Sequence, residues 1–421
     1  MLYLLILVVL ACIHQSVSAG FQLSGDAGVR ILLPKRSSFT KQDGTFDHFK
    51  AVKHTTKIVN KYRQNLLNFQ LNFGTFPPGF VSLPPLAAYP EEELERRQKE
   101  PLADEEDDVE WAGNIKIGTP PKTFLIDFDT GSADLWIPSS SCSHCTSSKS
   151  KYNNSASSTG AQKSGAFEIR YADGSNATGP IYTDTVTVGG VKATGQYFAA
   201  VTSESPNFAQ DPIDGVLGLA FPSISRLRQN PFFVTASAQK SVKDDAFAFK
   251  LASNGSELYL GGTDASLYKG AVEYHNVSST IGYWIINGAS AEVNGKSAVS
   301  GFDTIIDSGT SIMYGPPAAV QAFYKAIPNS KLYDKSGGFY TFPCRTPPQV
   351  AFNWGGKSWT ISAENLNFGE TEQGSGECVG TLAGQDLGLG DNTWLLGDSF
   401  MKNVYSVFSF SKNAVGFAAL K

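Results

Sequence analysis

One short stretch of sequence occurs twice in this chain of 421 residues, and the repeat constrains its fold more than any other feature. Phe128-Asp129-Thr130-Gly131-Ser132 and Ile306-Asp307-Ser308-Gly309-Thr310 each place a carboxylate after apolar residues and then turn on a glycine between two hydroxyls. Each copy is followed by a second short motif of apolar residues and a glycine, which we call its echo. The echo glycines are Gly218 and Gly397, which lie 89 and 90 residues beyond the respective aspartates. One Asp-Thr-Gly alone is most often an ordinary turn. Two copies with matched flanks and echoes predict two homologous halves that build one shared site.

A pair of carboxylates can hydrolyse a peptide bond without another catalytic side chain. When two carboxyl groups lie side by side they do not both ionise readily, so one keeps its proton while the other acts as a base. Beyond Gln98 the histidines are His144 and His275, and neither lies near a Gly-x-Ser-x-Gly or metal-binding pattern. The sequence beyond Gln98 therefore offers few of the residues that a serine or zinc mechanism needs. A glycosidase also uses two carboxylates, but its pair lies about 5 Å or more apart and needs no matched turns.

The paired stretches, and the sequence from about Glu110 to Lys421 around them, resemble the pepsin family of aspartic proteases, with fungal rhizopuspepsin-type members as the nearest pattern. The resemblance implies an all-β, bilobal fold with the active-site cleft between two homologous β-rich lobes, and neither a metal nor a cofactor. It implies that Asp129 and Asp307 share one water, which attacks the scissile carbonyl. Supporting roles would fall to their neighbours: cross-linking hydroxyls at Thr130 and Ser308, close-packing glycines at Gly131 and Gly309, and hydrogen bonds to the outer carboxylate oxygens from Ser132 and Thr310.

The same resemblance places a flap, a hairpin that closes over substrate, around Tyr171 and Gly174, with Trp136 supporting the tyrosine. The plainer alternative is that Tyr171 and Trp136 are core aromatics. Asp127 shares a strand face with Asp129, and Asp173 lies at the turn of the flap. Fungal relatives with acidic residues at these positions accept lysine, beside large apolar residues, on the amino side of the cut. Asp173-Gly174 is also what a tight hairpin turn needs, so a purely structural role stays open.

The first hundred residues differ in composition from the rest. Residues 1–19 carry no charged side chain and contain the apolar run Leu2 to Leu10, which is typical of a secretory signal peptide. Residues 20–66 contain nine Lys/Arg against three Asp, whereas the chain from Gln98 onward contains 23 Lys/Arg against 32 Asp/Glu. A basic block before an acidic body is typical of a nucleic-acid arm or of a propeptide, and a secreted chain favours the propeptide.

We therefore expect a propeptide at 20–97, processed at Arg96-Arg97 in an exposed linker. Lys61-Tyr62 resembles the Lys-Tyr pair of pepsin-type propeptides, so Lys61 is expected to enter the cleft and pair with the catalytic carboxylates. The alternative is that Lys61 is one more solvated charge in a basic helix.

The mature chain is expected to be mainly β-strand. Val, Ile, Thr, Phe and Tyr occur in short runs that are broken by turn residues. We expect a strand at 166–171 before the Asp173-Gly174 turn, and another at 184–188 before Gly189-Gly190. The helical segments are expected near 231–240 and 318–326. The lobes are expected at 98–267 and 268–421, meeting between Asp264 and His275.

Four cysteines remain once Cys12 is assigned to the signal peptide, and four allow three pairings. The family resemblance implies Cys142 with Cys145 and Cys344 with Cys378. A redox or zinc motif at Cys142-Ser143-His144-Cys145 would lack the second Cys/His pair. Four residues begin glycosylation acceptors of the form Asn-x-Ser/Thr: Asn153, Asn176, Asn254 and Asn276.

Taken together, the sequence predicts a secreted, monomeric aspartic endopeptidase made as a zymogen. Its expected partners are protein and peptide substrates and its own propeptide, with no nucleic acid and no membrane anchor. The secretory route leaves the vacuole open as a second destination. An inactive binding protein on the same fold is the main alternative, although both aspartates and both glycines are intact.

Overall fold

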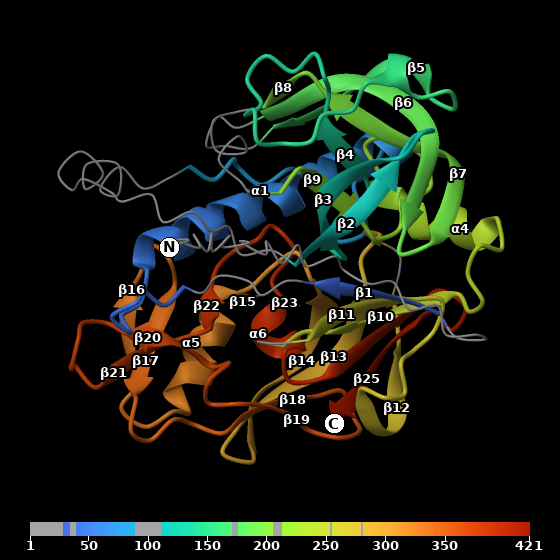
Figure 1. Cartoon of the computed structure of the whole chain (residues 1–421). Helices are drawn as coiled ribbons and strands as arrows, with labels where there is room; N and C mark the ends of the chain where they lie inside the picture. The colour runs from blue at the N-terminus through green and yellow to red at the C-terminus, as the bar shows by residue number, and fades with distance from the viewer. Residues whose placement is uncertain are drawn as a thin grey trace, which may run out of the picture.

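The computed structural model describes residues 28–33, 39–88, 111–170, 176–204, 213–252, 255–278 and 281–421. Strands dominate these segments and form four sheets, which confirms the predicted all-β architecture (Figure 1). The signal peptide, the Arg96-Arg97 processing point and the tip of the predicted flap lie outside the described residues.

The N-terminal half of the mature chain forms an eight-stranded sheet in the order β2-β3-β9-β4-β7-β6-β5, with β8 beside β6. Antiparallel pairing of β2 with β6 brings the first strand of this path against a later one. The strands are β2 Ala112–Ile117, β3 Lys122–Asp129, β4 Leu135–Pro138, β5 Ala161–Arg170, β6 Asn176–Val188, β7 Val191–Val201, β8 Ser203–Glu204 and β9 Gly215–Gly218.

The C-terminal half forms a seven-stranded and a four-stranded sheet. The larger has the order β19-β18-β13-β14-β23-β15-β22, and the smaller the order β16-β17-β21-β20. Their strands are β13 Ile285–Val293, β14 Lys296–Ile306, β15 Met313–Gly315, β16 Lys331–Asp334, β17 Phe339–Pro343, β18 Val350–Asn353, β19 Trp359–Ile361, β20 Asn367–Glu370, β21 Glu377–Gly380, β22 Leu382–Gly384 and β23 Thr393–Leu396.

A six-stranded sheet joins the two halves, because β10 from the first half pairs with β24 near the C-terminus. The predicted lobe boundary at 267 falls between two strands of this shared sheet, and it stays a prediction. In sheet order the strands are β1 Val29–Leu33, β11 Ser256–Leu260, β10 Ala246–Lys250, β24 Tyr405–Ser409, β25 Ala414–Leu420 and β12 Tyr268–Asn276.

The short elements expected from sequence are present. The helices α4 (Phe232–Ala238) and α5 (Pro317–Lys325) cover the two predicted helical segments. Gly189 and Gly190 both have positive φ, 57° and 103°, and form the two-residue turn between β6 and β7. The remaining short helices of the described residues are η1 (Asn154–Ala156), η2 (Pro222–Ile224) and α6 (Asp398–Met401).

The longest helix, α1 (His48–Phe73), belongs to the predicted propeptide and runs between the strands of the two halves (blue in Figure 1). Asp47 caps its first turn by accepting a hydrogen bond from Lys50 N, and Gly74 ends it with φ 77°. A buried stripe recurs every three or four residues along it, formed by Ala51, Thr55, Ile58, Tyr62, Leu66 and Phe69. The propeptide is therefore folded onto the body through one helix face.

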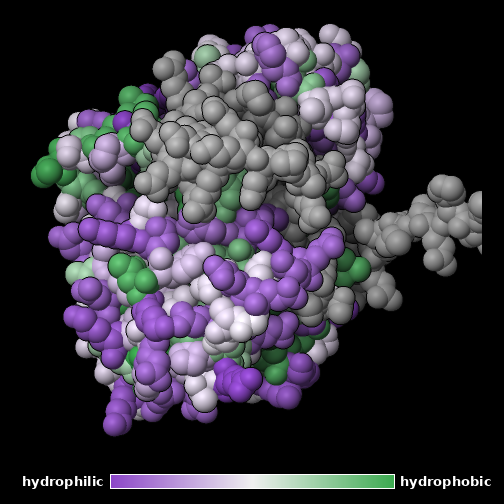
Figure 2. Space-filling view, turned by 90° about the vertical axis from the view of Figure 1, so that its left-hand side faces the viewer, coloured by the Kyte–Doolittle hydropathy of each residue, from purple (hydrophilic) through white to green (hydrophobic). Residues whose placement is uncertain are grey.

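Among the described residues, no helix combines the length and apolar character needed to cross a membrane. Figure 2 shows that hydrophilic side chains cover much of one face of the molecule, with hydrophobic side chains in separate groups between them.

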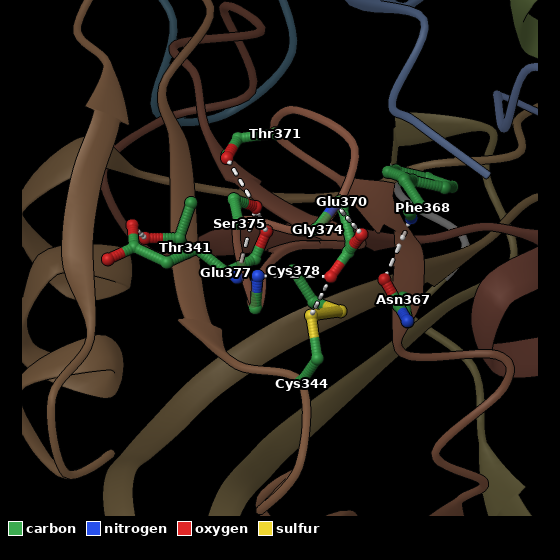
Figure 3. Close-up of a disulfide and its surroundings, with 12 residues drawn as sticks. Thr341, Cys344, Asn367, Phe368, Glu370, Thr371, Gly374, Ser375, Glu377 and Cys378 are labelled. Atoms are coloured by element: carbon green, nitrogen blue, oxygen red, sulfur yellow. Dashed lines mark hydrogen bonds between the residues drawn. A yellow bond between two sulfur atoms is a disulfide. The ribbon is translucent and has the colours of Figure 1, made fainter. Parts of the chain in front are cut away.

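Both expected disulfides are present, Cys142–Cys145 and Cys344–Cys378. The second joins the end of β17 to β21 across a sequence separation of 34 residues. Figure 3 shows it beside Glu370, whose carboxylate accepts hydrogen bonds from the backbone N–H groups of Gly374 and Gly376 at 2.8 and 3.0 Å.

We expect Cys344→Ser/Cys378→Ser to lower the free energy of unfolding by about 3–4 kcal/mol, because a longer closed loop restricts the unfolded chain more. Cys142→Ser/Cys145→Ser is the matched control, since it opens a loop of separation 3 and should cost about half as much. Denaturant unfolding of both variants tests this. Equal losses would show that chain entropy does not set the contribution.

Candidate active site

The two Asp-Thr/Ser-Gly stretches leave the ends of equivalent strands, β3 and β14, each of which runs parallel to the strand that carries the apolar-Gly echo. Asp129 pairs with Gly218 on β9, and Asp307 N donates to Leu396 O at 3.1 Å. A Cβ at Gly218 would lie 2.5 Å from the Ser132 backbone, and one at Gly397 would lie 2.1 Å from Thr310 O. The echoes are therefore glycine because the neighbouring active-site loop leaves no room for a side chain.

The two loops are cross-linked by reciprocal hydrogen bonds. Thr130 N donates to Ser308 Oγ at 3.1 Å, and Ser308 N donates to Thr130 Oγ1 at 2.9 Å. Each hydroxyl also donates across to the other half, Thr130 Oγ1 to Ile306 O at 3.0 Å and Ser308 Oγ to Phe128 O at 2.6 Å. All of these groups are buried, so the arrangement fixes the two halves against each other at this point.

The glycines bring the aspartates face to face. Gly131 N donates to Asp129 Oδ1 at 2.8 Å, and Gly309 N donates to Asp307 Oδ1 at 2.9 Å. A Cβ at Gly131 would lie 2.6 Å from Asp307 Oδ1, and one at Gly309 would lie 2.2 Å from Asp129 Oδ1. Any larger residue would push the opposite carboxylate away. Asp129 and Asp307 are only 3% and 0% exposed.

The outer oxygens are held unequally. Thr310 Oγ1 donates to Asp307 Oδ2 at 2.5 Å. Ser132 lowers the pKa of Asp129, yet its buried Oγ has no hydrogen-bond partner of ordinary geometry. The expected hydrogen bond to the outer carboxylate oxygen is therefore formed at Asp307 and only incompletely at Asp129. In this structure the propeptide is bound.

The pKa values of the two carboxyls shift in opposite directions. Burial raises the pKa of Asp129, and the charge of Asp307 raises it further, against the opposing charge of Lys61. Burial would also raise the pKa of Asp307, but the Lys61 charge and hydrogen bonds from Asp129, Lys61 and Thr310 outweigh it and lower that pKa. The two carboxyls are close enough to interact, so their titration belongs to the pair.

Lys61 lies between the two carboxylates. Its Nζ is 3.0 Å from Asp129 Oδ1 and 2.8 Å from Asp307 Oδ2, and its side chain is 11% exposed. Burial would lower the Lys61 pKa, but the charges of Asp129 and Asp307 outweigh burial and raise it. Tyr62 OH donates to Asp307 Oδ2 at 2.9 Å. Lys61 therefore makes a charge-neutralising contact with the two aspartates. It is not one more solvated charge on a basic helix.

Two of the predicted flap and substrate-binding residues, Trp136 and Asp127, line the cavity that contains Asp129. Trp136 on β4 is buried in a cluster with Phe167 and Ile169 of β5, the strand that leads to the flap. Asp127 lines the same cavity as Asp129, Trp136 and Lys61. Tyr171, Asp173 and Gly174 lie outside the described residues.

Two glycosylation candidates can be placed fully. Asn153 precedes η1 and Asn276 ends β12, and both are exposed. Asn176 begins β6 as the partner of Arg170, while Asn254 lies outside the described residues.

Three residues that contact the site were missed from sequence. Asn65 Nδ2 donates to Gly131 O at 2.8 Å, Tyr283 packs its ring 5.2 Å from that of Tyr62, and Asp134 accepts hydrogen bonds from Ser225 Oγ and Arg226 N at 2.7 Å. Asn65 follows Lys61 by four residues, so a predicted helix over this segment would have placed both on one face. Tyr283 and Asp134 carry no local pattern that marks them.

Comparison with known proteins agrees with this geometry. The model of the eukaryotic aspartyl protease family matches residues 110–420. An aspartic protease of Phaffia rhodozyma is 43% identical over 324 residues, 75% of this chain and 78% of that protein. Human cathepsin D is 36% identical over 337 residues, 74% and 81% of the two chains. Secreted aspartyl protease 1 of Malassezia globosa is 32% identical over 420 residues, 97% and 98% of the two chains.

Proposed function

Because the chain belongs to the eukaryotic aspartyl protease family and is an aspartic endopeptidase, we propose that it is made as a secreted zymogen that cleaves proteins at acid pH. Asp129 and Asp307 are the proposed catalytic residues. With one proton shared between Asp129 and Asp307, the pair takes a proton from a bound water, and the resulting hydroxide attacks the scissile carbonyl. The proton then passes to the leaving amine nitrogen.

The observation that carries the zymogen proposal is Lys61 Nζ at hydrogen-bond distance from both carboxylates. An ammonium there occupies the position that the attacking water needs. The pKa of Asp307 is lowered, so its contact with Lys61 contributes stability above its ordinary pKa near 4 and loses it as the pH falls through the lowered value. Acid therefore weakens the Lys61 contact.

The proposals of secretion and of processing are supported by a similarity that extends over the first hundred residues of the chain. The Malassezia relative, named a secreted aspartyl protease, aligns over nearly the whole chain, including this region. We propose removal of 1–19 as a signal peptide and of 20–97 as the propeptide.

Purification from the medium at neutral pH, followed by acidification, tests secretion and processing together. We expect a protein that lacks residues 1–19 at neutral pH and that gains activity as a chain beginning near Gln98 appears. Full activity at neutral pH in the uncut protein would contradict the zymogen proposal.

The proposed substrate preference is supported by the cavity beside the dyad. Trp136, Ile169 and Val216 give it apolar walls, which suit a large apolar side chain. Asp127 adds a carboxylate to the same lining, and Lys57 of α1 reaches the same cavity. An acidic cavity that already receives a propeptide lysine is suited to a substrate lysine on the amino side of the cut.

We expect Asp127→Asn and Asp173→Ser each to weaken cleavage after lysine by about ten- to a hundredfold, because a hydrogen bond to a charged partner contributes roughly 1.5–3 kcal/mol. Cleavage after phenylalanine should change little. The measurement is kcat/KM for two peptides that differ only at this position. Proportional losses on both peptides would show that the aspartate serves the structure of the site and not lysine recognition.

A further inference from the structure

The C-terminal half of α1 carries three asparagines on one face, separated by three and four residues, which we call the asparagine row: Asn65, Asn68 and Asn72. Each donates its side-chain amide to backbone carbonyls of the body. The bonds are Asn65 Nδ2 to Gly131 O at 2.8 Å, Asn68 Nδ2 to Ile224 O at 3.0 Å, and Asn72 Nδ2 to Ser223 O and Ser225 O at 2.9 Å each.

The row is fixed from the helix side. Asn65 and Asn68 are 4% and 2% exposed. Gln64 Nε2 donates to Asn68 Oδ1 at 2.9 Å, which turns the amide nitrogen of Asn68 toward Ile224. A buried carbonyl that lost such a donor would be left without a partner, which is costly.

The carbonyls that accept these bonds are also fixed. Gly131 belongs to the catalytic loop, and the other three acceptors belong to η2 and the residue after it. Asp134 holds this turn by accepting hydrogen bonds from Ser225 Oγ and Leu227 N at 2.7 and 3.1 Å. The body therefore presents a series of backbone acceptors from Gly131 to the η2 turn.

The row and Lys61 respond differently to acid. Amide donors and backbone acceptors do not titrate in the range where carboxylates do. The charged or titratable groups around the row are Tyr283, Arg228 and Asp134, together with Lys57, Lys61, Asp127 and Asp129, which line the same cavity as Asn65 and Asn68. Burial raises the pKa of Tyr283, so it stays neutral in acid, and Arg228, which donates to Leu71 O at 2.7 Å, stays charged. The aspartates can change charge in acid, and burial raises the pKa of Asp134. The asparagines donate to backbone carbonyls and not to any of these carboxylates.

We propose that Gly131 and the η2 turn form a docking surface for a helix with amide side chains at positions i, i+3 and i+7, and that α1 stays docked there after acid has broken the Lys61 contact. This rests on the proposed zymogen function and concerns the regulation of the same site. Acid breaks the contact between Lys61 and the dyad, but the cut propeptide dissociates only when the hydrogen bonds of the asparagine row are also broken. The excised segment is thus a partner of the enzyme in trans.

The test measures binding, not activity. All proteins carry Asp129→Asn, so that a released propeptide is not digested, and are cut after Arg97 with a dibasic-specific endopeptidase. The dissociation constant between the two pieces is measured by dilution and size-exclusion chromatography at pH 6 and pH 3. The variants are Asn65→Ala/Asn68→Ala/Asn72→Ala, Lys61→Met, and Gln70→Ala as the matched amide on another part of α1.

A neutral hydrogen bond corresponds to about two- to tenfold in affinity. We therefore expect the triple variant to bind at least about tenfold more weakly at both pH values. Lys61→Met should weaken binding more at pH 6 than at pH 3, because the contact with Asp307 fades as the pH falls toward the lowered pKa of that carboxyl, about 2. Gln70→Ala should weaken it at neither pH. Pairing of β1 with β11 is common to every variant.

If the triple variant matches Gln70→Ala at pH 3, the proposal is overturned. If the triple variant does not fold, Asn72→Ala alone carries the test, because Asn72 makes two of the four bonds at a partly exposed position. An absence of peptidase activity in wild type would contradict the proposed function but would not change this binding result.

Discussion

Purified Asp129→Asn and Asp307→Asn proteins are expected to fold and to be secreted, but to lose at least about 10³-fold in kcat/KM, as removal of a general acid or base does. Each substitution keeps the volume of the side chain and removes the carboxylate that shares a proton with its partner. Because such variants cannot process themselves, both they and wild type are cut after Arg97 before assay on a peptide at acid pH.

Asp303→Asn is the matched control, since it makes the same change four residues before Asp307 on β14 and away from the dyad. It should retain wild-type activity. Substantial turnover by either dyad variant, with circular dichroism showing a native fold, would rule out the assignment of that aspartate.

The precursor with Lys61→Met is expected to lose its latency at neutral pH. The two charged hydrogen bonds to Asp129 and Asp307 disappear, which weakens the hold of α1 on the cleft by on the order of a hundredfold. In wild type this contribution is present at neutral pH and is lost as the pH falls through the lowered pKa of Asp307. The variant should therefore activate faster than wild type at pH 5–7 and at a similar rate in stronger acid.

Rates of precursor cleavage across a pH series check this prediction. Lys53→Met, the same change two turns earlier on α1, is the control and should behave like wild type. A Lys61→Met precursor that is as latent as wild type at neutral pH, and no faster to activate, would show that the lysine does not gate the site.

The residues whose roles repeat along the chain were predictable from sequence. Asp129 and Asp307 share a local pattern, and a pattern that occurs twice constrains both backbone and partner. Gly218 and Gly397 were identified by spacing, and the structure supplies the steric reason for each. The Gly189-Gly190 turn follows from glycine's access to positive φ.

The features that depend on packing between distant segments were not predictable. The asparagine row needs the η2 turn, whose carbonyls lie about 150 residues further along the chain. Asn65, Asn68 and Asn72 looked like ordinary polar residues before the helix that aligns them was known. Asp134 likewise acquires its role only when Ser225 folds back onto it.

The most direct test of the proposed dyad is a titration with pepstatin, an inhibitor of aspartic proteases. The acid-activated protein, with its propeptide removed, is assayed on a peptide with a large apolar residue before the cut. We expect activity at acid pH that falls in proportion to added pepstatin and reaches zero near one inhibitor per molecule. Hydrolysis that persists at saturating pepstatin, or no hydrolysis once the cleft is free of α1, would contradict a mechanism based on Asp129 and Asp307.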